Sequence, residues 1–493
     1  MNALESPIPA VKGTSDRLPA DFARLAALES LLLDRFARAG YERLSTPVLE
    51  SIELHERKSG AGIVSKLFEL ADQSGRLCLR PELTAGVVRA FTGAEPPPSL
   101  PWRVSHAGPA FRRESPSRPG RLREFHQVGV ERLGDGGPVA DAEIIWLASW
   151  AMEEAGVKRS TIRLGHVGLI LEMLERSGLP ATAQASLVER LSEAAAEGGD
   201  VGSIGRGLDH FADWLRQAST SEEVSLAAVG PDDAGVDRLF RTLMPVVNGR
   251  RTGREIVGRL RRKWDLGHGF VDALDRVRDR ARALADLKGP PGPILDRLAR
   301  DYEALAPDSV ASLRALVESL GHHGVDLGRL ELDLGFGRGI GFYSQMVFEI
   351  VAPTASGPIE LCGGGRYDGL ARVLGSDRDP RGVGFAFGLE RLGAVLDAQR
   401  GKQGGAEEPG PIVVVPASAE AVPDAVRLAT RVRMEGFAAI LEASPGAEPA
   451  TSRRIFVEGR DLVLHDPHAK VPRRMSLDEL IRLLAAESRE SKP

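Results

Sequence analysis

Cysteine is scarce in this sequence. Its two cysteines, Cys78 and Cys362, lie far apart, and neither belongs to a CxxC pair or a paired His cluster. A disulfide framework or a structural zinc site needs more thiols at closer spacing. We therefore expect two buried or half-buried free thiols in a reducing compartment, and no metal site.

Long apolar runs and a strong charge of one sign are also missing. No run approaches the ~18 residues that span a bilayer, and the first residues do not have the pattern of a signal peptide. The formal net charge of −5 over 493 residues gives no strong field for nucleic acid or an anionic membrane. With 42% hydrophobic and 27% charged residues, we expect a soluble, cytoplasmic protein of about three domains and no membrane partner.

Hydrophobic periodicity separates strand-rich from helix-rich regions. Apolar residues at helical spacing predict a helix over 20–39 that ends at Gly40. Short alternating segments predict strands, and helical patterns fill about 139–330 before strand character returns. The predicted strands cover 41–51, 76–84, 122–134, 329–351, 359–370 and the first part of 381–392, which leads into a helix.

This order predicts an α+β fold, with an antiparallel sheet and flanking helices, a helical insertion and a small C-terminal α/β domain. The predicted parts are a first core segment at 1–154, the insertion at 155–328, a second core segment at 329–400, a Gly-rich linker at 401–410 and the small α/β domain at 411–493.

Charged and amide side chains occur inside the predicted strands. Gln127 and Glu131 are four residues apart, so on a strand they share one face. A buried carboxylate without a partner is costly, so this face is either a binding site or a solvated surface with cross-strand ion pairs. Arg112 and Arg121 flank a loop rich in Pro, Ser and Gly, where two guanidinium groups are suited to clamp a phosphate chain.

Six segments, in order, resemble the histidine branch of the class II aminoacyl-tRNA synthetases, from about residue 10 to about 395. They are GYERLSTPVLE (motif 1), LRPELTAGVVRA, FRRE…GRLREFHQVGVE (motif 2), GRGIGFY, GGGRYDGL and GVGFAFGLERL (motif 3). The resemblance implies a class II synthetase-like antiparallel sheet, a homodimer formed through motif 1 and a degenerate anticodon-binding-like C-terminal domain.

The resemblance also implies a histidine pocket. Its implied histidine-binding residues are Glu82 and Thr84 for the α-amino group, Gln127 near the carboxylate and amino end, Glu131 and Tyr343 for the imidazole nitrogens, and Arg338. The implied pocket walls are Gly364, Gly365, Arg366 and Tyr367, with Asp368 beside them.

In a ligase, Arg338 matches the catalytic arginine that neutralises charge as the histidine carboxylate attacks the α-phosphate of ATP. The implied ATP contacts of a ligase are Arg112, Glu114, Arg121 and Arg391. Such catalysis needs positioning and electrostatic stabilisation rather than a side-chain nucleophile.

Two functional classes share this scaffold. One is histidine–tRNA ligase, which uses ATP, Mg²⁺ and tRNA. The other is the non-catalytic regulatory subunit of ATP phosphoribosyltransferase, which needs no cofactor. It binds the short catalytic subunit that begins histidine biosynthesis and mediates feedback by histidine as ligand.

Four features favour the regulatory subunit. The segments at 160–179 and 330–349 contain the LGHVG and DLG sequences that are typical of that class. Gly341, Phe342 and Ser344-Gln345 stand where a ligase has Asp, Tyr and Thr-Gly. From Pro411 onward, twelve Arg and Lys balance twelve Asp and Glu, whereas a tRNA-binding domain is expected to be basic.

Other features favour the ligase. They are the retained Arg112, Glu114, Arg338 and Arg391, the sequence LRPELTAGVVRA, which is closer to that of the ligases, and the presence of a C-terminal domain. We therefore take the regulatory subunit as the first hypothesis and the ligase as the alternative.

Overall fold

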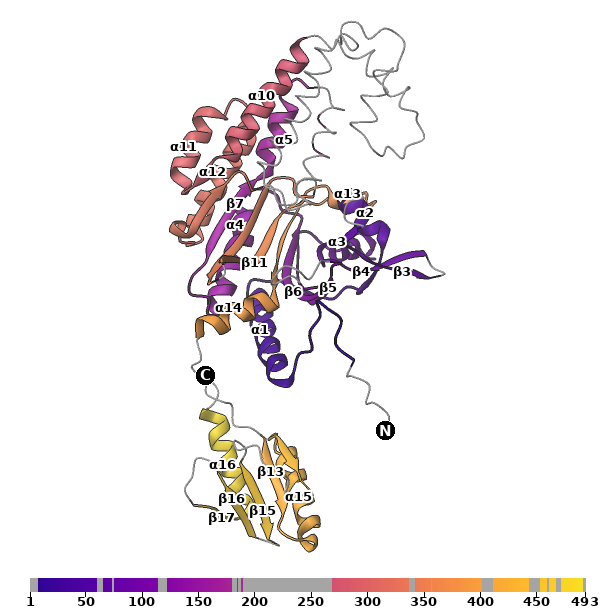
Figure 1. Cartoon of the computed structure of the whole chain (residues 1–493), viewed down its shortest axis with the longest axis vertical. Coiled ribbons are helices and arrows are strands. Elements are labelled where there is room, and N and C mark those ends of the chain that lie inside the picture. The colour runs from indigo at the N-terminus through magenta and orange to yellow at the C-terminus, as the bar shows by residue number, and fades with distance from the viewer. Residues whose placement is uncertain are drawn as a thin grey trace, which may run out of the picture. The chain divides into compact units, whose positions relative to one another are not determined.

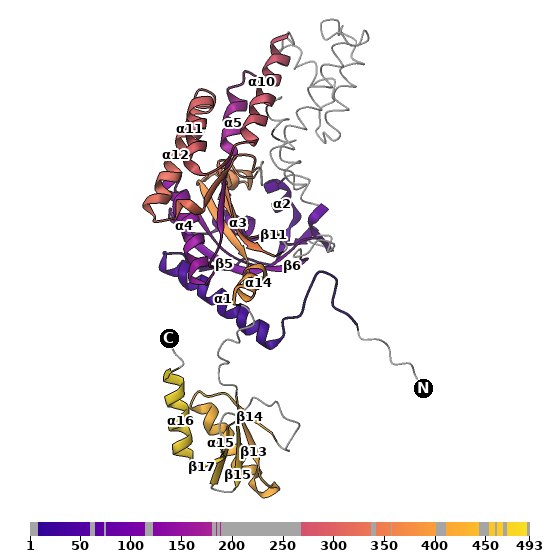
Figure 2. The same cartoon turned by 60° about the vertical axis from the view of Figure 1, so that its left-hand side comes forward.

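The computed structural model consists of two compact units, Met1–Gln399 and Arg400–Pro493, each of which is described by itself (Figures 1 and 2). The residues that the structure describes are 8–59, 65–72, 75–113, 122–179, 184, 188, 268–336, 342–355, 357–400, 411–442, 453–458, 461–466 and 471–490. Glu114, Arg121, Arg338, Gly341 and the predicted linker at 401–410 lie outside these residues.

A nine-stranded mixed sheet forms the centre of the first unit. In spatial order its strands are β1 (Glu42–Leu44), β5 (Trp102–Phe111), β6 (Glu124–Leu133), β12 (Gly382–Gly388), β11 (Gly357–Arg366), β10 (Met346–Thr354), β7 (Thr161–His166), β9 (Leu330–Asp333) and β8 (Lys288–Gly289). The pairs β1–β5 and β7–β9 are parallel, and every other neighbouring pair is antiparallel. The sheet with flanking helices that the sequence predicts is confirmed.

The prediction of one strand over 41–51 was wrong. The chain leaves β1 at Leu44 and starts a new strand, β2 (Leu49–Ser51), in a separate three-stranded sheet with β3 (Phe68–Asp72) and β4 (Gly75–Leu79). Between the two strands, the buried guanidinium of Arg80 donates hydrogen bonds to the carbonyl oxygens of Thr46 (2.7 Å) and Pro47 (3.3 Å). These carbonyls therefore bind a side chain instead of a neighbouring strand.

Helices cover the central sheet on one side. They are α1 (Pro19–Arg38), α4 (Pro138–Glu154), α5 (Val167–Glu175), α10 (His268–Ala285), α11 (Pro291–Asp301), α12 (Pro307–His322) and α14 (Leu389–Arg400), and a 3-10 turn at Leu327–Arg329 precedes β9. Helix α4 contacts β10, β11 and β12 and is itself covered by α12. Most apolar residues of α4 are buried, because the helix lies between the sheet and α12, and this explains why apolar residues occur on more than one of its faces.

Three shorter helices belong to the other side of the sheet. Helix α2 (Ile52–Ser59) contacts α3 (Thr84–Gly93), and α13 (Leu370–Val373) contacts both (Figures 1 and 2). Phe91 of α3 belongs to a buried cluster with Leu133 of β6 and Tyr367. This cluster closes the side of the sheet opposite α4.

The segment predicted as a helical insertion also supplies strands of the main sheet. Strand β7 pairs with β10 and β9, and β8 forms one edge of the sheet. Ile162 and Leu164 of β7 are fully buried, so this alternating stretch packs as sheet core, and helix α5 begins directly after it at Val167.

The second unit is a small α/β structure. Its sheet has the order β14 (Ala439–Leu441), β13 (Ile412–Pro416), β15 (Arg454–Glu458), β16 (Asp461–His465) and β17 (Arg473–Met475). Its helical segments are η3 (Ala419–Ala421), α15 (Val422–Met434) and α16 (Leu477–Glu490). A core of its own, which includes Val414, Leu428 and Leu480, shows that this unit does not depend on the first for apolar burial.

Candidate functional site

The two faces of β6 have different roles. Val128 and Val130 point into the main core with α1 and α4. Gln127 and Glu131 alternate with them and face the other side of the sheet, as their spacing predicts. Opposite Glu131 on β12 lies Gly384, where an added Cβ would stand 1.9 Å from Glu131 Oε2. Glycine is therefore needed at this position to make room for the carboxylate.

Glu131 is 1% exposed and already has a hydrogen-bond donor. The hydroxyl of Tyr367 donates to its Oε2, and Nε2 of His106 lies 3.6 Å from its Oε1. Burial, together with the negative charge of Glu131, raises the pKa of Tyr367 well above its ordinary value, so the phenol keeps its proton and remains the donor.

The carboxylate of Glu82 lies at the start of α3. Its oxygens accept hydrogen bonds from the backbone N–H groups of Thr84 (2.7 Å) and Ala85 (3.1 Å). The ammonium group of Lys58, on α2, lies 2.9 Å from Oε2, and Nδ1 of His55 lies 3.8 Å from Oε1. Burial alone would raise the pKa of Glu82, but Lys58, His55 and the N–H donors outweigh it and lower the pKa to about 2. Glu82 is therefore a carboxylate at any physiological pH.

Aromatic rings connect Glu82 with Glu131. The Lys58 ammonium lies 3.9 Å from the centroid of the Phe342 ring. That ring stacks on Tyr367 at a centroid distance of 5.4 Å and contacts Tyr343 at 4.7 Å. Tyr343 packs against Gly365, where a Cβ would approach its ring to 2.7 Å. Four predicted site residues, Glu82, Glu131, Tyr343 and Tyr367, thus lie in one contiguous cluster.

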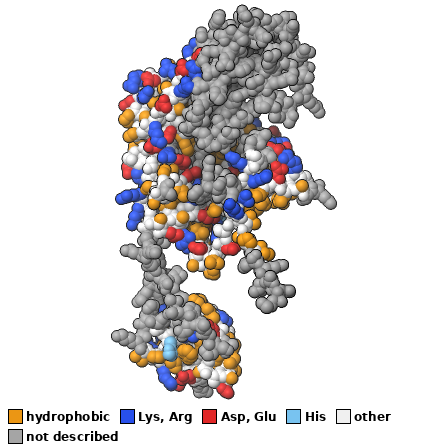
Figure 3. All heavy atoms as spheres, in the orientation of Figure 1, with side chains coloured by type: hydrophobic (Ala, Val, Ile, Leu, Met, Phe, Trp, Pro, Cys, Tyr) orange, Lys and Arg blue, Asp and Glu red, His pale blue; other side chains and the backbone are white. Residues whose placement is uncertain are grey.

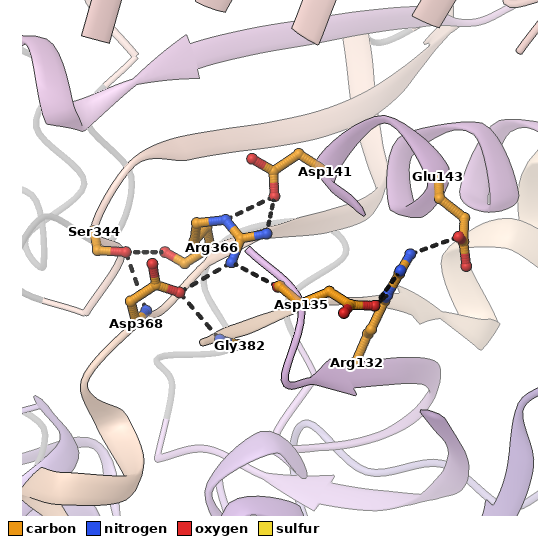
Figure 4. Close-up of polar contacts among 8 residues, drawn as sticks. All are labelled: Arg132, Asp135, Asp141, Glu143, Ser344, Arg366, Asp368 and Gly382. Carbon is orange, nitrogen blue, oxygen red and sulfur yellow. Dashed lines mark hydrogen bonds and ion pairs between the residues drawn. The ribbon is translucent and has the colours of Figure 1, made fainter. Parts of the chain in front are cut away.

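Arg366 lies beneath this cluster and is fully buried. Its guanidinium donates to Asp141 Oδ1 (2.8 Å), to Asp368 Oδ1 (3.0 Å) and to the carbonyl oxygen of Asp135 (3.3 Å), as Figure 4 shows. Asp368 in turn accepts from the backbone N–H of Gly382 at 3.1 Å. Arg366 therefore fixes the turn that presents Tyr367, and its own charge is neutralised by carboxylates.

The remaining predicted residues lie around the cluster. Nε of Arg112 donates to the carbonyl oxygen of Pro81 (3.0 Å), next to Glu82. Gln127 Oε1 is buried and has no hydrogen-bond partner among the residues that the structure describes. Arg391, near the start of α14, is 38% exposed on its side chain and lies 3.7 Å from Glu360 Oε2. Glu114, Arg121 and Arg338 lie outside the described residues, so the roles assigned to them from the sequence stay predictions.

Four residues of the cluster were not predicted as site residues from the sequence, namely Lys58, His55, His106 and Phe342. Lys58 lies on a mostly polar helix, in the stretch IELHERKS, where a lysine resembles any solvated side chain. His106 lies at an inward position of the alternating strand β5, which is a detectable signal.

A hollow of about 350 Å³ occurs in the second unit, bounded by Phe456, Glu458 and His465. Its lining is mostly apolar, and no group of convergent charges accompanies it, so the candidate site is the cluster in the first unit. Within the described ranges, no three His, Cys, Asp or Glu side chains are arranged to hold a metal ion. No helix among these residues is long and apolar enough to cross a membrane.

Comparisons with known proteins agree with this geometry. A family model described as histidyl-tRNA synthetase matches residues 13–217 and 235–392. An ATP phosphoribosyltransferase regulatory subunit from Moorella thermoacetica is 30% identical over 460 residues, which cover 92% of this chain and 97% of the relative. A histidine–tRNA ligase from Desulforudis audaxviator is also 30% identical, over 498 residues that cover 97% and 98% of the two chains.

Solved structures show the same fold. A protein from Bacillus halodurans C, described as an ATP phosphoribosyltransferase regulatory subunit/histidyl-tRNA synthetase, superposes with a TM-score of 0.61 at 20% identity, covering 90% of this chain and 94% of that one. The apo histidyl-tRNA synthetase of S. aureus gives 0.62 at 20% identity, with coverages of 97% and 99%.

Proposed function

We propose, from the premise that this chain belongs to the histidyl-tRNA synthetase-like family, that it is a non-catalytic regulatory subunit of ATP phosphoribosyltransferase. In this role it binds the short catalytic subunit, supports its activity and mediates its inhibition by histidine. We further propose that the chain forms a homodimer through the motif 1 region and binds histidine in the cluster around Glu82 and Glu131. No cofactor is needed for this function.

The segment after residue 341 carries the proposal. A ligase has two tyrosines followed by Thr-Gly here, whereas this chain has Phe342, Tyr343 and Ser344-Gln345. Phe342 cannot donate a hydrogen bond, and its ring is stacked on Tyr367. The Ser344 N–H donates to the carbonyl oxygen of Arg366 (2.7 Å), and its hydroxyl accepts from the N–H of Asp368 (3.0 Å). These residues serve packing and turn geometry, and a misplacement of catalytic groups by about 1 Å costs roughly 100-fold in rate.

The charge of the C-terminal unit also supports the proposal. From Pro411 onward, twelve basic and twelve acidic residues give no net positive charge. On the face drawn in Figure 3, blue and red side chains are interspersed without a large single-sign patch. Binding to tRNA gains most of its affinity from neutralised phosphates, for which this unit offers no excess of cations.

The alternative function is histidine–tRNA ligase, with ATP, Mg²⁺ and tRNA. The placement of Arg112 beside the Glu82 loop favours it, because an arginine there is well placed to contact a phosphate next to a bound amino acid. In that case Arg338 would be the catalytic residue, and Arg112 and Arg391 would contact ATP.

Two measurements separate the functions. The first is histidine-dependent ATP–pyrophosphate exchange, with Arg338→Ala as the control variant. We expect no exchange from folded wild-type protein, and exchange that the variant loses would establish the ligase. The second is size-exclusion chromatography with the short catalytic subunit. We expect a complex at micromolar concentrations, and its absence would overturn the proposal.

A further inference from the structure

Lys58 and Arg57 are adjacent cations on α2 with opposite environments. The side chain of Arg57 is 50% exposed and pairs with Glu53 on its own helix. The side chain of Lys58 is 6% exposed, and its ammonium lies between the Glu82 carboxylate and the face of Phe342. Lysine is seldom buried unless it is paired, so the position of this ammonium is set by the site and not by solvent.

The acceptor sites of Glu82 are largely filled in this arrangement. A carboxylate offers about four lone-pair sites, two on each oxygen. Oε2 accepts from the Thr84 N–H and the Lys58 ammonium, and Oε1 accepts from the Ala85 N–H and faces His55. An incoming α-ammonium brings three N–H donors, but the Lys58 ammonium already holds Oε2, and the Ala85 N–H and the imidazole of His55 face Oε1. Lys58 thus supplies from inside the protein the interaction that an amino acid would supply from outside.

We infer that Lys58 is a tethered competitor for the α-ammonium of an amino acid at Glu82, and that it raises the histidine concentration needed to fill the site. The inference rests on the proposed function in taking histidine as the ligand of this cluster. When only a fraction of the protein has a site that can accept the ligand, the apparent affinity for the ligand is reduced by that fraction. Withdrawal of the Lys58 ammonium from Oε2 is the movement that admits the ligand, and the face of Phe342, already 3.9 Å from the ammonium, attracts the cation when it leaves the carboxylate.

Two probes test this competition, because they differ only at the α-carbon. L-Histidine carries the α-ammonium, and 3-(imidazol-4-yl)propionate has hydrogen there instead. Isothermal titration calorimetry gives the ratio of their affinities for wild type and for Lys58→Met, Lys58→Arg and Arg57→Met in the full chain. A purely structural role of Lys58 would change both affinities together and leave this ratio constant.

We expect Lys58→Met to shift the ratio toward histidine by at least about tenfold, the value of one charge-assisted hydrogen bond. Lys58→Arg keeps the competing cation, and Arg57→Met removes an exposed one, so both are expected to keep the wild-type ratio within about twofold. Adding Glu82→Gln to Lys58→Met is expected to remove the gain. Thermal unfolding followed by tryptophan fluorescence verifies that each variant is folded.

An unchanged ratio in Lys58→Met, an equal change in Arg57→Met, or no histidine binding by Lys58→Met would each overturn the inference. Complex formation with the catalytic subunit is measured on the same variants and is expected to persist in all of them. Failure to form this complex in wild type contradicts the proposed function, whereas failure of the ratio test with an intact complex contradicts the role of Lys58 alone.

Discussion

Replacing Arg366 with methionine tests how strongly the first unit depends on one buried charge network. The guanidinium is fully buried and donates to Asp141, Asp368 and the carbonyl oxygen of Asp135. Removal of one partner from a buried ion pair costs about 3–5 kcal/mol, because the other charge is left without compensation. We expect Arg366→Met to lower the free energy of unfolding by that amount.

The protonation of Asp141 gives this loss a pH dependence. Asp141 is 1% exposed, and burial raises the pKa of its carboxyl even with Arg366 present. In Arg366→Met, the Asp141 carboxyl takes up a proton on folding. The free energy of unfolding of this variant is therefore greatest at low pH, and it falls as the pH rises above the ordinary pKa of an aspartate. The difference from wild type is therefore expected to be smaller at pH 5 than at pH 8.

Urea unfolding followed by tryptophan fluorescence measures this difference for the first unit alone, since all five tryptophans precede the predicted linker. The matched control is Arg372→Met. That side chain is 76% exposed and pairs with Asp379 at 2.6 Å, so we expect a loss within about 1 kcal/mol. A loss in Arg366→Met no larger than that of the control would refute the reasoning.

Three further predictions concern other buried groups. Burial lowers the pKa of His166 to about 4, below the ordinary 6.5. The contribution of the neutral imidazole to the free energy of unfolding is therefore complete above pH 6.5 and is lost as the pH falls toward 4. In urea unfolding between pH 7 and 4.5, we expect wild type to lose about 2 kcal/mol more than His166→Gln. Glu131→Ala removes the carboxylate predicted to bind the imidazole, and calorimetry is expected to show no histidine binding, with unchanged affinity contradicting the assignment. Cys78 and Cys362 are 0% and 1% exposed, and burial raises the pKa of Cys78 to about 11, so the native protein is expected to react with Ellman's reagent only on unfolding, and rapid labelling at pH 8 would contradict this burial.

Local pattern was sufficient to predict the strand that supports the site. The alternation of 122–134 identified β6, and the four-residue spacing put Gln127 and Glu131 on one face because side chains on a strand alternate with period two. The resemblance then indicated that Glu82, Tyr343 and Tyr367 belong with them, and the structure brings Glu82, Glu131, Tyr343 and Tyr367 together.

Local sequence pattern does not predict contacts between segments that are far apart in the chain. The hydrogen bond from Tyr367 to Glu131 joins residues 236 apart, and the pairing of Lys58 with Glu82 depends on how α2 packs against α3. Local pattern also fails at β7, because the short alternating stretch TIRLGH lies beside helical sequence and falls within the predicted helical insertion, although the structure places it in the central sheet. In each case tertiary packing decides what the local sequence leaves open.

The strand order of the central sheet has a consequence for synthesis on the ribosome. Strand β6 pairs on one side with β5, which precedes it closely, but its other partner is β12, in which Gly382 faces Leu133. Until about 250 further residues have been made, β6 remains an edge with unpaired backbone groups, and such edges promote aggregation. The nascent first unit therefore stays incomplete until motif 3 leaves the exit tunnel, and we expect slow folding because the pairing of β6 with β12 closes a long loop.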